Sequence, residues 1–122
     1  MAFEFAEEKI VENQNEKVND AKYCISMVPN EENANVNGSV HGGVLFLLCD
    51  EAIGRYVTSL GRKGAAADAN IHFYRPAKIG ERIYATVRER KVGRKLGVYL
   101  VEITGQDGKL LADSLFTVAF SE

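Results

Sequence analysis

The sequence predicts a single α+β domain in which a long helix packs on one face of an antiparallel sheet of about five strands. A chain of 122 residues can bury one core but not two. One long apolar stretch has the composition of a buried helix, and the residues after it alternate between apolar and polar side chains. Several strands in succession after one helix give an α+β fold, and we expect residues 1–122 to form one domain.

The first forty residues are expected to form a short surface helix, a strand and a loop. Residues 1–20 are polar and acidic, which favours a short helix on the surface. Residues 22–28 are rich in strand formers and stop at Pro29, as a strand would. Residues 29–39 are rich in Pro, Asn, Gly and Ser, so they predict a loop.

A buried helix is predicted from Gly42 to about Leu60. Most of these residues are good helix formers, and apolar side chains occur on almost every side, which is typical of a helix inside a protein. Three charged residues interrupt the apolar stretch, and together with its length they argue against a membrane span. They are Asp50, Glu51 and Arg55.

Four strands are predicted after Gly61. The tetrapeptides VGRK and QDGK predict hairpin turns between the last three of them. The predicted strands are residues 65–76, which end at Pro76, 82–90, 96–104 and 110–120. The alternation is clearest in the second strand, where one set of side chains is Ile83, Ala85 and Val87 and the other is Tyr84, Thr86 and Arg88.

The composition is that of an ordinary soluble protein, with 46% hydrophobic and 26% charged residues. A formal net charge of -2 gives no general attraction to nucleic acid. The first ten residues lack the features of a secretory signal, so we expect a cytoplasmic protein with no membrane partner. Cys24 and Cys49 lie far apart without CxxC spacing, and we expect two buried thiols rather than a disulfide or a metal site.

The start of the predicted helix offers a site for a negative oxygen. The first backbone N–H groups of a helix have no partner inside the helix, and the helix dipole adds positive charge there. Gly42 and Gly43 have no side chains that would block the approach of an oxygen that becomes negative during a reaction. The alternative is that the two glycines only allow a tight entry into a crowded helix.

The two adjacent acids of the helix call for different explanations. Glu51 has Arg55 four residues later, the favourable orientation for a helical ion pair. Asp50 has no such partner, and the residues one turn away are Phe46, Leu47, Ile53 and Gly54. A buried carboxylate costs several kcal/mol of desolvation, and such groups are often catalytic bases or nucleophiles. The alternative is a buried Asp50 that caps a neighbouring loop through hydrogen bonds.

The spacing of Gly42 and Asp50 predicts a homodimer if both groups are catalytic. Eight residues of helix separate them by roughly 12 Å. A base and an oxyanion site that act on one carbonyl must both lie within about 3–3.5 Å of the reacting atoms. The two groups of one active site must then come from different copies of the chain.

These motifs resemble a known family. Asn35, Gly38, His41-Gly42-Gly43 and Asp50, followed by DANIHFYRPAKIGERI, are similar in spacing to the PaaI-like branch of the hotdog-fold acyl-CoA thioesterases, the 4HBT superfamily. The resemblance covers roughly residues 20 to 120. It implies a five-stranded antiparallel sheet wrapped around one long helix, paired into dimers and commonly into dimers of dimers.

The resemblance implies hydrolysis of an acyl-CoA thioester to a free acid and CoA. The amide of Gly42 and the side chain of Asn35 would polarise the carbonyl. Asp50 of the facing subunit would act as general base or as nucleophile, and both routes remain open. His41 would orient the Asn35 loop and the helix start, although a direct catalytic role also remains open. No cofactor is expected, and no metal site either, because His72 is the only other histidine.

One position departs from some relatives, which carry Ser or Thr on the strand before the RP segment. This sequence has Ala66 there, and we include it among the substrate-binding residues. Without that hydroxyl, either Asn70 or His72 holds the attacking water or hydrolysis is slower. Ala65, Ala66 and Ala67 could equally mean close packing of the strand on the helix.

The substrate-binding residues are expected in two groups. An apolar pocket for the acyl group would include Gly43, Phe46, Leu47 and Tyr56 together with residues of the partner. The hairpin RERKVGRK is the basic part of an acidic chain, and we expect Arg90, Arg94 and Lys95 to contact the phosphates of CoA. The alternative is that these side chains are only solvated.

Two alternatives to hydrolysis share the hotdog fold. A hotdog module that binds or senses acyl-CoA without hydrolysing it has no need of a costly buried acid, so Asp50 argues for the enzyme. A hotdog hydratase would show an Asp-x-Asn-Pro-x-His stretch, which the sequence lacks. The residues do not identify the acyl group.

Overall fold

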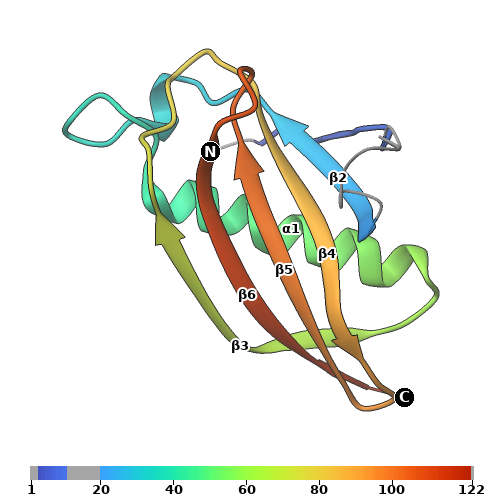
Figure 1. Ribbon diagram of the computed structural model, residues 1–122. Helices are drawn as coiled ribbons and strands as arrows, with labels where there is room; N and C mark the ends of the chain where they lie inside the picture. Colours follow the sequence, from blue (N-terminus) through green and yellow to red (C-terminus); the bar gives the residue numbers. More distant parts are fainter. Residues whose placement is uncertain (1–2, 11–19, 122) are drawn as a thin grey trace.

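The computed structural model describes residues 3–10 and 20–121, which form one α-helix packed on a six-stranded antiparallel sheet (Figure 1). The order of strands across the sheet is β1-β2-β4-β5-β6-β3. In Figure 1 the long strands β4, β5 and β6 cross in front of α1. The elements are β1 (Ala6–Glu7), β2 (Ala21–Met27), the 3-10 helix η2 (Glu31–Asn33), α1 (Gly42–Ser59), β3 (Gly64–Phe73), β4 (Ile83–Val92), β5 (Leu96–Thr104) and β6 (Leu110–Phe120).

The predicted fold class is confirmed, including the single long helix and the five long strands. The helix prediction at the N-terminus is wrong for residues 3–10, which contain no helix and contribute the short strand β1. Ala6 pairs with Ser26 on the free edge of β2, and the Ser26 hydroxyl donates a 2.6 Å hydrogen bond to Glu8. Phe3 and Phe5 both pack against the core, and their spacing of two residues suits a strand rather than a helix. Residues 11–19 lie outside the described residues.

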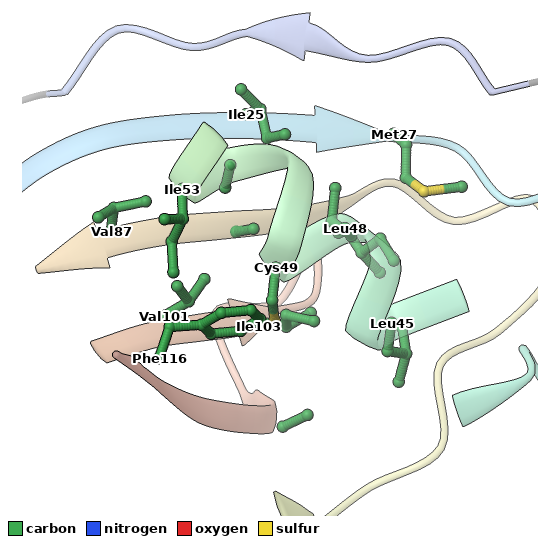
Figure 2. Close-up of a cluster of buried hydrophobic side chains, with 14 of the residues drawn as sticks. Ile25, Met27, Leu45, Leu48, Cys49, Ile53, Val87, Val101, Ile103 and Phe116 are labelled. Carbon is green, nitrogen blue, oxygen red and sulfur yellow. The ribbon is translucent and has the colours of Figure 1, made fainter. Parts of the chain in front are cut away.

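The core lies between one face of α1 and the sheet (Figure 2). Leu45, Leu48, Cys49 and Ile53 of α1 pack against side chains of four strands, among them Ile25, Val87, Val101 and Phe116. Ile83, Ala85 and Val87 are buried, as the alternation in β4 predicts. Such burial of apolar area is the main stabilising contribution to a fold of this size.

Both cysteines are free and buried, which confirms the prediction of two thiols without a disulfide. Cys49 faces the core from α1, and burial raises the pKa of its thiol to about 12. The thiol therefore stays protonated at neutral pH, the form without nucleophilic reactivity.

The sheet leaves two neighbouring surfaces uncovered. None of the ten residues of the edge strand β3 is buried. One stripe of α1 also faces solvent, contrary to the expectation of a helix buried on nearly every side, because the sheet covers only one of its faces. The exposed residues of this stripe are Gly43, Asp50, Gly54 and Thr58.

Candidate active site

The entry of α1 presents free backbone N–H groups. The carbonyl oxygen of His41 accepts hydrogen bonds from the amides of Val44 (3.0 Å) and Leu45 (3.3 Å). The amides of Gly42 and Gly43 come before these, and they have no acceptor in the part of the chain that the structure describes. They lie at the positive end of the dipole of an 18-residue helix, so an anionic oxygen would be stabilised there.

The side chain of His41 is exposed and makes no capping hydrogen bond to the helix. The backbone N–H of His41 donates to the carbonyl of Asn33 at 2.8 Å, which joins the helix entry to the preceding loop. The backbone of His41 therefore organises the helix start, while its imidazole is open to solvent.

Asn35 holds a tight turn directly before the helix. Its side-chain oxygen accepts hydrogen bonds from the backbone N–H groups of Asn37 (2.9 Å) and Ser39 (3.1 Å). Gly38 closes the turn with φ of 78°, a conformation that glycine adopts without strain. Since the oxygen is occupied, the side-chain NH₂ of Asn35 is the part that can donate to another molecule.

Asp50 lies halfway along α1, and it is exposed rather than buried in the single chain. Within the described ranges, no group donates a hydrogen bond to the Asp50 carboxylate or forms an ion pair with it. The alternative in which Asp50 caps a neighbouring loop is therefore not observed. Glu51, in contrast, forms the predicted ion pair with Arg55, at 2.7 Å. The expectation that Asp50 is buried is wrong for the single chain, because the sheet covers only one face of α1 and Asp50 lies on the uncovered stripe.

Two grooves meet at Asp50. The smaller, of about 320 Å³, is mostly apolar and runs along α1 from Gly43 to Asp50; the other residues that line it are Phe46, Leu47 and Phe116. The rings of Phe46 and Phe116 pack edge to face, with their centroids 5.5 Å apart. The larger, of about 1240 Å³, runs from Asp50 along the second half of α1 to the start of β3.

Tyr56, expected in the acyl pocket, lies on the buried face of α1 instead. Its hydroxyl donates a 2.5 Å hydrogen bond to Glu89, and burial together with this bond raises the pKa of Tyr56. It therefore helps to hold α1 on the sheet and does not line either groove.

Ala66 lines the larger groove together with Asp50. Ala65, Ala66 and Ala67 are exposed, so they are not packed closely against the helix of their own chain. The register of β3 against β6 shifts between Ala66 and Asp68, which is the mark of a β-bulge.

The bulge places Asn70 and His72 on the outer face of the sheet. They pair with Leu115 and Asp113, which alternate with the buried residues Ala112 and Ser114 of β6. Directly opposed residues of antiparallel strands lie on the same face. Neither side chain therefore lies on the helix side of the sheet, where Asp50 of the same chain is found.

The basic hairpin lies next to one end of the larger groove. Arg90, Arg94 and Lys95 are exposed. Arg62 donates hydrogen bonds to the carbonyls of Gly93 (3.1 Å) and Arg94 (2.7 Å), which fastens the β4–β5 hairpin to the turn after α1. Arg62 and Lys63 line this groove, and we did not predict either of them. The sequence signal that could have indicated them is the occurrence of two basic residues in succession directly after the predicted end of the helix.

In the described part of the chain, no three His, Cys, Asp or Glu side chains converge as a metal site would require. None of the helices described there has both the length and the apolar content needed to cross a membrane.

One long helix covered on a single face by a curved antiparallel sheet defines the hotdog class of folds. The chain belongs to the thioesterase superfamily, which it matches over residues 37–112, well over half of its length. This membership confirms the resemblance that the helix-entry motif indicates.

Individual relatives agree with this family. The chain is 35% identical over 88 residues to the acyl-coenzyme A thioesterase PaaI of Escherichia coli, a match that covers 72% of this chain and 63% of that protein. It is 34% identical over 99 residues to human acyl-coenzyme A thioesterase 13, covering 79% and 71%. The chain thus spans less than two thirds of the length of the bacterial relative.

A solved structure extends the similarity to the whole fold. The crystal structure of a hypothetical thioesterase from Streptococcus pneumoniae with coenzyme A superimposes with a TM-score of 0.84 at 26% sequence identity. The match covers 97% of this chain and 86% of that one.

Proposed function

We propose that the protein hydrolyses acyl-CoA thioesters to a free acid and CoA. One observation carries this proposal: α1 presents free amides at its start and an exposed carboxylate, Asp50, at its middle, with an apolar groove between them. Oxyanion donors and a base beside an apolar groove are what acyl transfer to water requires. The names of the relatives and the coenzyme A in the pneumococcal structure support the choice of acyl-CoA.

In the proposed reaction the thioester oxygen accepts hydrogen bonds from the Gly42 amide and from the NH₂ of Asn35. Asp50 either takes a proton from the attacking water or attacks the carbonyl carbon itself to form an anhydride, which water then opens. In both routes the C–S bond breaks, the thiolate of CoA leaves and takes up a proton, and the acid is released. His41 ties the helix start to the loop that precedes the Asn35 turn, through its backbone hydrogen bond to Asn33.

The two halves of each site come from two copies of the chain. Gly42 and Asp50 lie on one unbroken helix, roughly 12 Å apart along its axis. The exposed edge of β3 and the uncovered stripe of α1 are adjacent surfaces on which a second copy can dock. A homodimer brings Asp50 of one subunit to the helix start of the other, and pairing of such dimers gives a tetramer.

The substrate is proposed to divide between the two grooves. The acyl group lies in the smaller one, against Gly43, Phe46 and Leu47. The CoA moiety follows the larger one past Ala66 towards Arg62 and Lys63. Arg90, Arg94 and Lys95 stand beyond that end and bind the phosphates.

A panel of acyl-CoA substrates tests the function, with release of free CoA measured by a thiol reagent. We expect turnover of at least one straight-chain, branched or aryl acyl-CoA at a rate proportional to enzyme concentration. Saturable binding of acyl-CoA without release of thiol on any member of the panel would contradict the enzyme and favour an acyl-CoA sensor of the same fold.

Replacing both Arg94 and Lys95 with alanine is expected to raise the KM for acyl-CoA about tenfold at low ionic strength and to leave kcat nearly unchanged. The reason is that phosphate contacts far from the thioester bind the ground state and the transition state equally. Added salt should shrink the difference from wild type, because it screens these charges. Lys109→Ala, which removes an exposed lysine beside the β5–β6 turn, is the matched control. An unchanged KM in the double variant would remove the hairpin from the CoA site.

A further inference from the structure

A phenylalanine that the sequence did not single out stands against the first residue of α1. A Cβ at position 42 would lie 2.8 Å from Cζ of Phe73 and 3.2 and 3.4 Å from its two Cε atoms. These three atoms form the tip of the ring, so Phe73 points end-on at Gly42. Gly43, the next residue, has open space where its Cβ would be.

The ring is held there by the end of β3. After Phe73 the backbone amides of Tyr74 and Arg75 donate to the carbonyl of Leu111, at 2.8 and 3.1 Å. The hydroxyl of Tyr74 donates to Asp113 at 2.8 Å on the outer face. The chain that follows Phe73 is therefore anchored to β6, while Phe73 itself remains 54% exposed.

The position of this ring matters for chemistry at the Gly42 amide. The edge of an aromatic ring carries partial positive charge and its face partial negative charge. An edge that points at the helix start is compatible with a negative oxygen beside it, whereas a face would repel that oxygen.

We propose that Phe73 is a specificity-determining residue of the hydrolase site, because its ring edge forms one wall of the space in which the thioester carbonyl binds. This inference rests on the proposed thioesterase function. The wall lies beside the oxygen position, so it limits the room for substituents on the carbon next to the carbonyl. Straight-chain acyl groups fit this space, and acyl groups branched at the 2-position are disfavoured.

Phe73→Ala tests the wall with two substrates, the best straight-chain acyl-CoA and its 2-methyl analogue. Loss of the ring edge should lower kcat/KM for the straight-chain substrate about three- to tenfold. The ratio of kcat/KM for the branched over the straight substrate should rise about tenfold, because the removed ring frees the space of a methyl group. A merely structural role of Phe73 would not move this ratio.

Leu115→Ala is the matched control, since Leu115 is an exposed apolar residue on the outer face of β6 and makes no contact that holds the Phe73 ring. In this control, the ratio of kcat/KM for the branched over the straight-chain substrate should stay at the wild-type value. Phe73→Leu replaces Phe73→Ala if the latter fails to fold.

The outcomes separate this inference from the proposed function. A wild-type protein that turns over acyl-CoA, with an unchanged branched-to-straight ratio in Phe73→Ala, overturns the role of Phe73 and leaves the thioesterase proposal standing. A wild-type protein inactive on every acyl-CoA overturns both.

Discussion

Asp50→Asn will lower kcat for acyl-CoA hydrolysis about a hundredfold or more and will leave the fold intact. Asparagine has nearly the shape of aspartate, but its amide neither accepts a proton from water nor attacks a carbonyl. The native carboxylate is exposed in the single chain and bonds no group in the described ranges, so its replacement removes no stabilising contact within the subunit. Steady-state rates of thiol release, together with thermal unfolding of the variant, measure both effects.

The adjacent acid provides the control. Glu51 is tied to Arg55 by a partly exposed ion pair, and such pairs contribute less than about 1 kcal/mol. Glu51→Gln should therefore keep kcat within about twofold of wild type and shift the unfolding temperature only slightly. The assignment of Asp50 is wrong if Asp50→Asn retains more than half of the wild-type kcat. Equal losses in both variants would mean that the local charge, and not one carboxylate, supports the reaction.

The elements predicted correctly are those whose signal is local. α1 is an uninterrupted stretch of helix formers and apolar residues, and the side chains of β4 alternate at the period of a strand, so the sequence is sufficient to locate both elements. The strand β1 was missed because two residues cannot form a strand alone. It exists through pairing with the free edge of β2, which lies more than ten residues away along the chain.

The same distinction between local and long-range signals explains which residues of the candidate site could be predicted. Gly42 and Asp50 could be identified from a helix entry and from a charge in an apolar stretch, but the exposure of Asp50 depends on what covers α1. Phe73 carried no local signal, because the role proposed for it depends on a contact with a residue 31 positions earlier.

The bulge in β3 decides on which face of the sheet Asn70 and His72 lie. Counting by two from Ala66 puts Asn70 and His72 on the same face as Ala66. The bulge between Ala66 and Asp68 adds one residue and reverses the alternation, so that Ala69 and not Asn70 continues the helix-facing side. A bulge depends on the pairing with β6, and alternation alone does not reveal it.

A heterodimer of one Asn35→Asp subunit and one Asp50→Asn subunit is expected to have about half of the wild-type activity, although each homodimer is nearly inactive. Asn35→Asp suits this test because a carboxylate can still accept the two backbone hydrogen bonds of the turn, while the NH₂ donor is lost. If each site combines the helix start of one subunit with Asp50 of the other, one of the two sites carries both substitutions and the second is intact. Two different affinity tags allow purification of the mixed dimer for the measurement.

The reciprocal heterodimer decides between shared and separate sites. It pairs a wild-type subunit with one that carries both substitutions, so it contains the same set of residues in a different arrangement. Sites shared between subunits predict almost no activity, because each site then lacks either Asn35 or Asp50. Sites within one subunit predict the opposite pattern, with about half activity here and none in the first heterodimer. That opposite pattern would contradict the shared site and would require Asp50 to reach the helix start of its own chain.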